Sequence, residues 1–245
     1  MKSFLSKINI VLITIVIYIC YVEISLADRR IYFEKYTLRD SYVDYGLIKN
    51  DIKVILYGSL VGVGVLYTLP ESITNWNKNN IKLETLTDKW YKNIKAGPVW
   101  DNDDFFLNYV THPYWGAVYY IAGRSAGAGA LTSFYYSVIV STFFWEYGVE
   151  AFAEVPSIQD LIITPVVGSI FGETFYLLKR YIINNNNKLF NSKIIGKTLK
   201  ILMDPITEVS SLFTDDKDIN NSYSFLYPSY KNGKTSINFL YVKRF

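Results

Sequence analysis

Acidic side chains are concentrated in one otherwise apolar segment of the chain. Residues 105–178 contain five acids and a single base, and the other side chains are apolar, aromatic, small or neutral polar. Glu146, Glu150 and Glu154 follow one another at steps of four, so on an α-helix their carboxylates share one face. A buried ion in a poor dielectric is strongly unfavourable unless it is paired, metal-bound or protonated. If this face points inward, a compensating group is therefore required.

The only base of this segment is Arg124. We expect it to pair with one of the carboxylates, because a guanidinium group binds a carboxylate through two parallel hydrogen bonds. The acids that remain would then have raised pKa values, share protons or hold a cation.

A second stripe at steps of four consists of Asp160, Thr164, Gly168 and Gly172. The two glycines allow a neighbouring helix to approach closely, and Asp160 falls in the first turn of a helix, where a carboxylate suits the helix dipole. A helix cap followed by close packing and a functional site explain the polar residues equally well. Pro165 lies inside this helix and must distort it, which in a membrane bundle often marks a site.

The one histidine, His112, opens a stretch of small residues that enters the acidic core. A lone histidine is more often structural than catalytic, but this position makes it a candidate general base. The Gly-x-Ser-x-Gly, Walker, Rossmann and His-Glu-x-x-His patterns are absent from the sequence. The candidate catalytic residues are His112, Arg124, Glu146, Glu150 and Asp160, and the candidate ligand-binding residues are Glu154, Thr164 and Glu173. No metal or cofactor is identified by these residues.

The elements that carry these residues are expected to be apolar helices. Residues 125–145 and 161–172 are free of charge, and we favour helices in lipid over a bundle buried in protein. Residues 54–70 predict another embedded or buried helix that ends near Pro70, and the alternation in residues 236–245 predicts one strand. The expected fold is mainly α: a bundle of short hydrophobic membrane-associated helices with a polar acidic interior and a short C-terminal strand.

The N-terminus has a basic start, a short apolar centre and small residues before Asp28, which is the pattern of a secretory signal peptide over residues 1–27. An uncleaved anchor helix is the alternative. The rest of the chain divides into an N-terminal helical or interfacial region (28–104), a core hydrophobic helical domain (105–183) and a polar basic tail (184–245). Residues 71–104 predict an amphipathic helix and a loop near Gly97-Pro98. The lysines of the tail suit an anionic membrane surface and a solvated helix about equally.

Composition excludes several classes of protein. The chain has 245 residues, half of them hydrophobic, with a net charge of +3 and a mean hydropathy of +0.12. One cysteine and one histidine exclude a disulfide framework, a zinc finger and any site that needs two histidines. No basic stripe is evident, so nucleic acid is not an expected partner.

A resemblance to a known family is carried by the core segment, in residues that include His112-Pro113-Tyr114-Trp115-Gly116, Arg124, Trp145-Glu146-Tyr147, Glu150, Pro156-Ser157-x-x-Asp160, Thr164-Pro165 and Gly168-x-x-x-Gly172-Glu173. These residues resemble the bacterial domain of unknown function 3943. The resemblance implies a bacterial envelope protein of unestablished activity. More distantly, the stripe is similar to VanZ-like membrane proteins, although these usually carry asparagine where Thr164 stands and an arginine before the aspartate. That similarity implies a helical, membrane-associated architecture.

Three functions are compatible with these observations. The first is a cell-envelope component, associated with either the inner or the outer membrane after secretion, whose acidic core binds a lipid headgroup or a cation. The second is a membrane-associated hydrolase or transferase in which His112 or a carboxylate is the general base and Arg124 steadies an anionic substrate. The third is a purely structural envelope protein in which the polar residues hold the helices together. Membrane lipid is the expected partner, with envelope proteins as further candidates.

Overall fold

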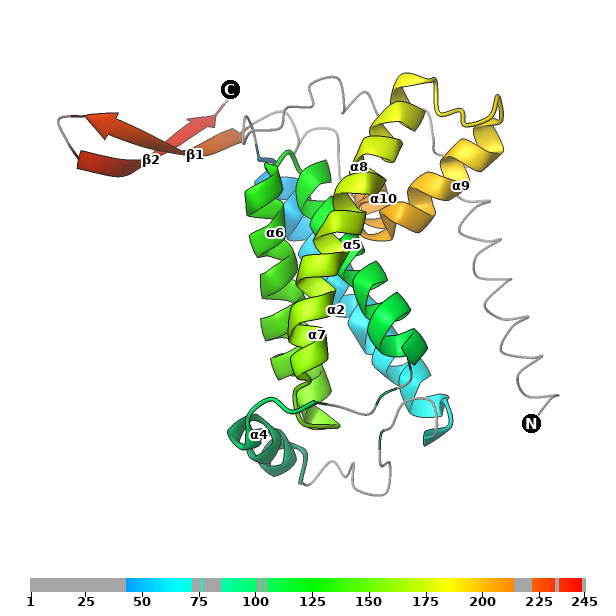
Figure 1. Cartoon of the computed structure of the whole chain (residues 1–245). Coiled ribbons are helices and arrows are strands. Elements are labelled where there is room, and N and C mark those ends of the chain that lie inside the picture. The colour runs from blue at the N-terminus through cyan, green and yellow to red at the C-terminus, as the bar shows by residue number, and fades with distance from the viewer. Residues whose placement is uncertain are drawn as a thin grey trace.

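Helices dominate the structure, as the sequence predicts. The computed structural model describes residues 43–71, 76, 85–100, 103, 105–213, 222–231 and 234–243, the last two ranges for the backbone alone. Within these ranges an upright bundle of helices stands on a shorter helix that lies across its lower end (Figure 1). The predicted signal peptide lies outside the described residues.

The centre of the bundle is helix α5 (His112–Ser125), which the short π-helix η3 (Leu107–Thr111) precedes. Eleven of the 14 residues of α5 are buried, because most are small or apolar. The helix ends in a tight turn at Gly127, whose φ of 89° is readily adopted only by glycine, and α6 (Ala130–Val138) then runs back down the bundle.

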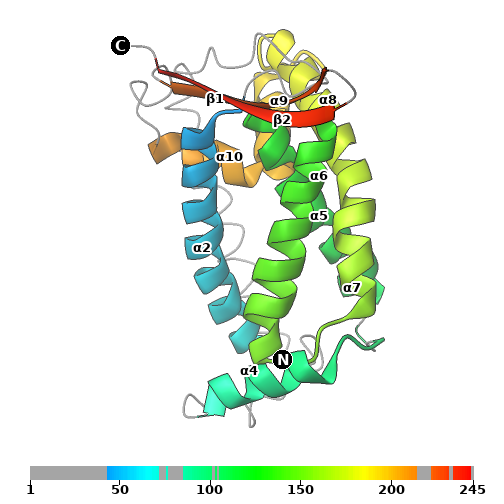
Figure 2. The same cartoon turned by 90° about the vertical axis from the view of Figure 1, so that its left-hand side faces the viewer.

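Three helical columns surround α5 (Figure 2). The first is α2 (Tyr45–Thr68). The second is α6 with its π-helical continuation η4 (Ile139–Val149) and the 3₁₀ turn η5 (Glu150–Phe152). The third consists of α7 (Ile158–Ile162), the π-helix η6 (Ile163–Val167) and α8 (Gly168–Asn184).

The third column is distorted at Pro165, as the sequence predicts. This proline lies in η6, where its missing N–H removes one α-helical hydrogen bond and the wider π turn accommodates the ring. Close packing of α8 on α5 follows directly above. A side chain on Gly168 would place its Cβ 2.6 Å from the Cα of Gly116, and one on Gly172 would lie 2.7 Å from the ring of Tyr120. The predicted close approach at these two glycines is therefore confirmed.

The lower end of the bundle is closed by the amphipathic helix α4 (Leu86–Ala96). The Trp90 indole donates to the Tyr147 carbonyl over 2.9 Å, and the Asn93 side chain donates to the Ala151 carbonyl over 3.0 Å. Gly97 ends the helix with a φ of 76°, which confirms the predicted helix and loop.

The upper end is covered by α9 (Lys193–Met203), α10 (Pro205–Ser210) and the 3₁₀ turn η7 (Ser211–Phe213). Met203 packs with Ile121, Tyr176 and Ile182 in one apolar cluster. These two helices follow the asparagine run that ends α8, so the first part of the basic tail is folded against the core.

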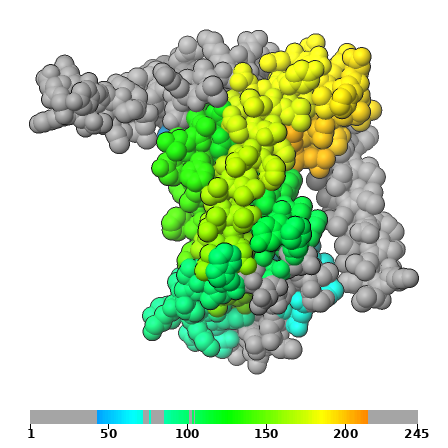
Figure 3. All heavy atoms as spheres, viewed as in Figure 1, coloured from blue at the N-terminus to red at the C-terminus, as the bar shows by residue number. Residues whose placement is uncertain are grey.

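The outer faces of the columns are apolar and exposed. Two helical stretches, Tyr45–Thr68 and Ile158–Asn184, are long and apolar enough to cross a membrane, and only 6% and 28% of their most apolar windows are buried. Leu60 and Ile170 are each about two-thirds exposed. Figure 3 shows one such face, on which the third column runs from α9 at the top to α4 at the foot.

The described C-terminal residues form an antiparallel hairpin of β1 (Ser222–Lys231) and β2 (Lys234–Lys243), paired from Ser222 with Lys243 to Lys231 with Lys234. The predicted strand is confirmed, although it begins at Lys234 rather than Ser236. The partner strand β1 was not predicted from the sequence. The Asn232-Gly233 pair between them is a typical hairpin connection and is the signal that could have revealed it.

Candidate functional site

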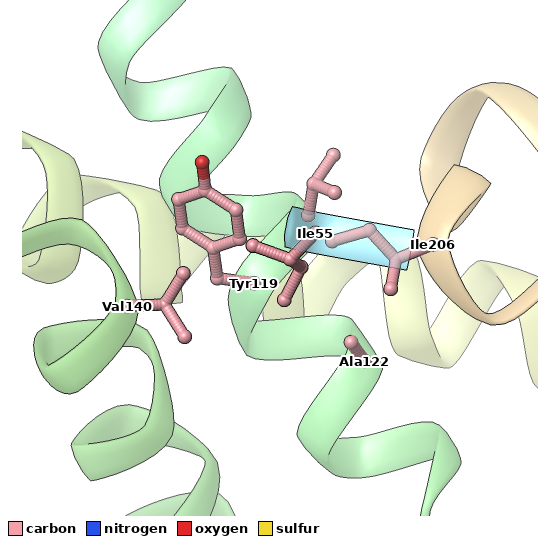
Figure 4. Close-up of a cluster of buried hydrophobic side chains, with 6 residues drawn as sticks. Ile55, Tyr119, Ala122, Val140 and Ile206 are labelled. Carbon is pink, nitrogen blue, oxygen red and sulfur yellow. The ribbon is translucent and has the colours of Figure 1, made fainter. Parts of the chain in front are cut away.

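A cavity of about 470 Å³ lies between α2 and the rest of the bundle. Along α2 its lining is mostly apolar, and we call these residues the α2 wall: Val54, Ile55, Gly58, Ser59, Gly62, Val65, Leu66 and Leu69. Toward α10 the cavity is bounded by Pro205, Ile206 and Val209. Figure 4 shows Ile55, Tyr119 and Ile206 meeting beside Val140 and Ala122, in the apolar cluster that limits the cavity at this end.

The opposite end of the cavity, near α4, is polar and acidic. We call it the acidic pole, and the polar side chains that line the cavity there are Asp103, Thr111, His112, Ser141, Glu146, Glu150 and Thr164. The cavity therefore has an apolar side and an acidic side, and Tyr119 lies between them, since it packs with Ile55 and Ile206 and its pKa is raised by burial and further by the charge of Glu150.

His112 is held in the acidic pole by two partners from the third column. Its Nδ1 lies 3.5 Å from an Asp160 carboxylate oxygen and 3.3 Å from the Thr164 hydroxyl. Because Asp160 and Thr164 stand one helical turn apart, α7 and η6 present both to the same ring nitrogen. Asp160 lies behind His112 rather than in the cavity lining, so it acts on the cavity through the imidazole.

Glu146 organises the same region through the backbone. Its carboxylate is 3% exposed and accepts a hydrogen bond from the backbone N–H of Ser157, the residue that caps α7. The Ser157 hydroxyl accepts in turn from the backbone N–H of Asp160 over 3.2 Å. Glu146 thereby fixes the start of α7, and with it the position of Asp160 beside His112.

Two oxygen atoms of the acidic pole are buried and have no hydrogen-bond partner among the residues that the structure describes: Oγ of Ser141 and Oε2 of Glu150. Ser141 is 5% exposed, and both residues line the cavity. Burial raises the pKa of Glu150 well above its ordinary value, and the negative charges of Glu146 and Glu154 raise it further. An unpaired buried acceptor is unfavourable, so each of these two atoms marks a position where a hydrogen-bond donor would be favoured.

Glu154 lies at the margin of this site and outside the cavity lining. Its Oε1 accepts from the Trp76 indole N–H over 3.1 Å, and Trp76 itself lines the cavity. Lys89 of α4 lies close enough for the Glu154 charge to act on its pKa. The predicted row of three carboxylates on an α-helix is therefore altered, because η4 is a π-helix and Glu150 begins a 3₁₀ turn.

Arg124 and Glu173 are brought together, but away from the acidic pole. The arginine donates through Nε and Nη2 to the two Glu173 oxygens over 2.9 and 3.1 Å, and through Nη1 to the Ala128 carbonyl over 2.9 Å. The Tyr120 hydroxyl also donates to Glu173 over 2.6 Å, and the guanidinium lies 3.9 Å from the centre of the Tyr176 ring. Every group of this cluster has its bonds within the protein, so the arrangement is that of a helix-pairing contact.

A second buried polar cluster escaped the sequence analysis. Lys179 is fully buried and lies 2.6 Å from Asp204 and 3.0 Å from Glu208, and Ser125 donates to Asp204. Ser210 donates likewise to the buried Asp51 of α2. These contacts join α2, α5, α8 and α10 at the upper end of the bundle, and a lysine inside an apolar helix is the sequence signal that could have found them.

The lining residues that sequence reasoning missed are Ser141, Asp103 and Thr111 at the acidic pole, together with the α2 wall. Ser141 carries no signal, since a serine in an apolar run is common, whereas the spacing of Gly58 and Gly62 is visible in the sequence. Among the described residues, no three histidine, cysteine or acidic side chains are grouped so that they could hold a metal ion.

This arrangement can perform two kinds of chemistry. Two basic side chains, His112 and the nearby Lys89, face the five acids that gather at this end of the described structure. These acids are Asp103, Glu146, Glu150, Glu154 and Asp160. The acidic pole therefore favours a cation that also donates hydrogen bonds. An imidazole held by a carboxylate can also accept a proton from a group in the cavity.

Comparison with known proteins agrees with the family resemblance. Residues 97–206 match the family described as domain of unknown function 3943. The match contains every residue of the acidic pole and excludes α2. No curated protein matches the chain, and no solved structure matches it.

Proposed function

We propose that this protein is a membrane-embedded component of the cell envelope that binds an amphiphile with a positively charged, amine-type headgroup at the acidic pole. The proposal rests on Oε2 of Glu150 and Oγ of Ser141, which are buried without a hydrogen-bond partner among the described residues and belong to side chains that line a cavity with an apolar wall. A protonated amine supplies both the charge and the hydrogen bonds that these two oxygens lack.

Placement in a bilayer is supported by the length and exposure of the columns. At about 1.5 Å per residue, α2 is about 36 Å long and the stretch Ile158–Asn184 is about 40 Å long, against a hydrocarbon core of about 30 Å. Their exposed apolar side chains would contact lipid. In water the same faces would form large apolar patches.

The two ends of the bundle are suited to the membrane surfaces. Helix α4 lies across the lower end, with Tyr91 and Trp100 more than half exposed beside it, as in interfacial aromatic belts. At the upper end α9 carries Lys193 and Lys197 with the exposed Ile194, which is typical of a helix on an anionic surface. The acidic pole then lies near the level of the lipid headgroups, next to α4.

A second function is favoured by the contact between His112 and Asp160. At 3.5 Å, Asp160 can orient the imidazole, which lines the cavity, as in hydrolases that use a histidine base. In that case the amphiphile is a substrate whose scissile bond lies beside His112. Arg124 is bound to Glu173 and therefore has no role in this hydrolase mechanism.

The test is the binding of dodecylamine to the detergent-purified protein, measured by native mass spectrometry. Glu150→Gln keeps the shape of the side chain and removes its charge, and Asp88→Asn removes a charge from exposed Asp88 of α4 as a matched control. We expect Glu150→Gln to weaken dodecylamine binding at least tenfold and Asp88→Asn to leave it unchanged. Dodecanoate, with the same chain and an opposite charge, should bind less tightly than dodecylamine to the wild-type protein, and equal binding of the two would overturn the proposal.

A further inference from the structure

The glycines of this protein fall into two groups that differ in their surroundings. At Gly116, Gly168 and Gly172 an added Cβ would collide with the neighbouring helix, so these glycines permit close packing. At Gly58 and Gly62 of α2 no atom of the described residues lies within 4 Å of an added Cβ, although both glycines line the cavity. Close contact between helices therefore does not account for the second group.

We infer that Gly58 and Gly62 form a subsite for a single alkyl chain along the α2 wall, so that the ligand is a long-chain amine rather than a small cation. This inference rests on the proposed function for its headgroup. Glycine weakens a helix interior, and here the absent side chains leave an open strip facing the cavity. An alkyl chain lying on that strip would contact backbone on one side and the bundle on the other.

The lining of the cavity supports a chain of considerable length. The α2 wall extends from Val54 to Leu69, 15 residue steps that correspond to about 22 Å of helix. It is apolar apart from Ser59, whose hydroxyl donates to the Leu56 carbonyl of its own helix. Ile206 and Val209 of α10 continue the apolar lining beyond Val54, so a chain whose amine lies at Glu150 points toward α10.

The attachment of α2 supplies a lateral route of access. Its two buried residues, Asp51 and Ile55, both lie in its first half, where Ser210 and Ile206 hold them. The second half, which contains Gly62, contributes no buried residue. The lower part of α2 therefore stands beside the cavity without being packed on the bundle, and a lipid chain can reach the α2 wall from the bilayer.

The direction of the ligand agrees with the orientation of a lipid in one leaflet. Its headgroup would lie at the acidic pole, next to the interfacial helix α4, and its chain would extend toward the middle of the bundle. A ligand that moves sideways from the bilayer into the cavity would not need to turn over. The bound amine replaces the missing donor at Ser141 and Glu150, while the chain covers the α2 wall.

The experiment compares Gly62→Leu with Gly64→Leu, both in the full chain in detergent. Gly64 also has nothing within 4 Å of an added Cβ but does not line the cavity, so the two variants make the same change in the same helix. Three probes are titrated by native mass spectrometry: dodecylamine, propylamine and the uncharged dodecanol. Equal melting temperatures of the two variants by circular dichroism control for folding.

We expect Gly62→Leu to weaken dodecylamine and dodecanol binding at least tenfold and to leave propylamine binding unchanged, while Gly64→Leu resembles the wild type. Unchanged dodecanol and dodecylamine binding in Gly62→Leu would overturn the chain subsite. If Glu150→Gln still weakened the binding of dodecylamine and propylamine in that case, the proposed headgroup site would be supported without the chain subsite. Conversely, the other combination is a loss of dodecanol binding in Gly62→Leu while the wild-type protein binds dodecanol as tightly as dodecylamine. That pair of results would support the chain subsite and overturn the proposed amine site at Glu150.

Discussion

Arg124 binds Glu173 through two hydrogen bonds, of 2.9 and 3.1 Å, about 12 residues up α5 from His112. At about 1.5 Å per residue this places the pair about 18 Å from the histidine along the helix axis. The only base between residues 105 and 178 is thus used to join α5 to α8. Glu150 is left to be compensated by a proton or by a ligand.

Replacing Glu146 by alanine should destabilise the fold. Its carboxylate is buried and accepts the backbone N–H of Ser157, so Glu146→Ala leaves that N–H without its acceptor. We expect a loss of about 1–3 kcal/mol in the free energy of unfolding. Glu146→Gln retains an acceptor oxygen and should lose less. Thermal unfolding followed by circular dichroism measures both, and equal melting temperatures for Glu146→Ala and the wild type would contradict this role.

Glu150→Gln should stabilise the protein at neutral and alkaline pH. Burial and neighbouring acids raise the pKa of Glu150 in the folded state above that of the unfolded chain. The folded state therefore holds a proton that the unfolded state has released, so stability falls as the pH rises from the ordinary glutamate range through the raised pKa. The glutamine variant has no such loss. Melting temperatures of both proteins between pH 4 and pH 9 check this prediction. A higher melting temperature for the wild type than for Glu150→Gln at high pH would refute it.

The same raised pKa gives ligand binding a pH dependence of the opposite sign. A protonated amine binds the ionised form of Glu150, whose neighbours are Glu146, Glu154, Asp160 and Asp103. Binding must release the Glu150 proton, so dodecylamine affinity should rise with pH until Glu150 is ionised in the free protein. The affinity of Glu150→Gln should change less over the same range. A wild-type affinity for dodecylamine that falls as the pH rises over this range would be inconsistent with an amine bound at this carboxylate.

Gly168→Ala should be strongly destabilising, whereas Gly58→Ala should not. The alanine Cβ at position 168 would lie 2.6 Å from backbone atoms of α5, and neither helix can move without disturbing the bundle. We expect a loss of about 1–3 kcal/mol or more at Gly168. At Gly58 the Cβ meets nothing within 4 Å, and the higher helix propensity of alanine favours the variant. Comparable melting temperatures for the two variants would show that the glycines are not of two kinds.

Much of the fold can be read from local sequence signals. The Gly168-x-x-x-Gly172 spacing predicts the close approach to α5, and Ser157 before Asp160 predicts the helix start that α7 shows. These features depend on residues a few positions apart. The pairing of Arg124 with a carboxylate is also predictable, because the segment offers a single base.

The remaining features depend on contacts between distant parts of the chain. The steps of four at Glu146, Glu150 and Glu154 assume an α-helix, whereas the packed bundle holds η4 as a π-helix. Ser141 becomes notable only because the fold leaves its hydroxyl buried beside a cavity. The α2 wall likewise depends on how α2 is docked, through Ile55 and Ile206, onto a bundle whose other helices lie far away in sequence.

The binding of a cationic amphiphile headgroup by Glu150 is tested most directly by native mass spectrometry of the detergent-extracted protein. Wild type, Glu150→Gln and the Asp88→Asn control are compared for a molecule that is retained through purification. We expect an amine-bearing, long-chain adduct on the wild type and on Asp88→Asn, which is lost from a folded Glu150→Gln. The same adduct on all three proteins, or an adduct that carries only anionic groups, would contradict it.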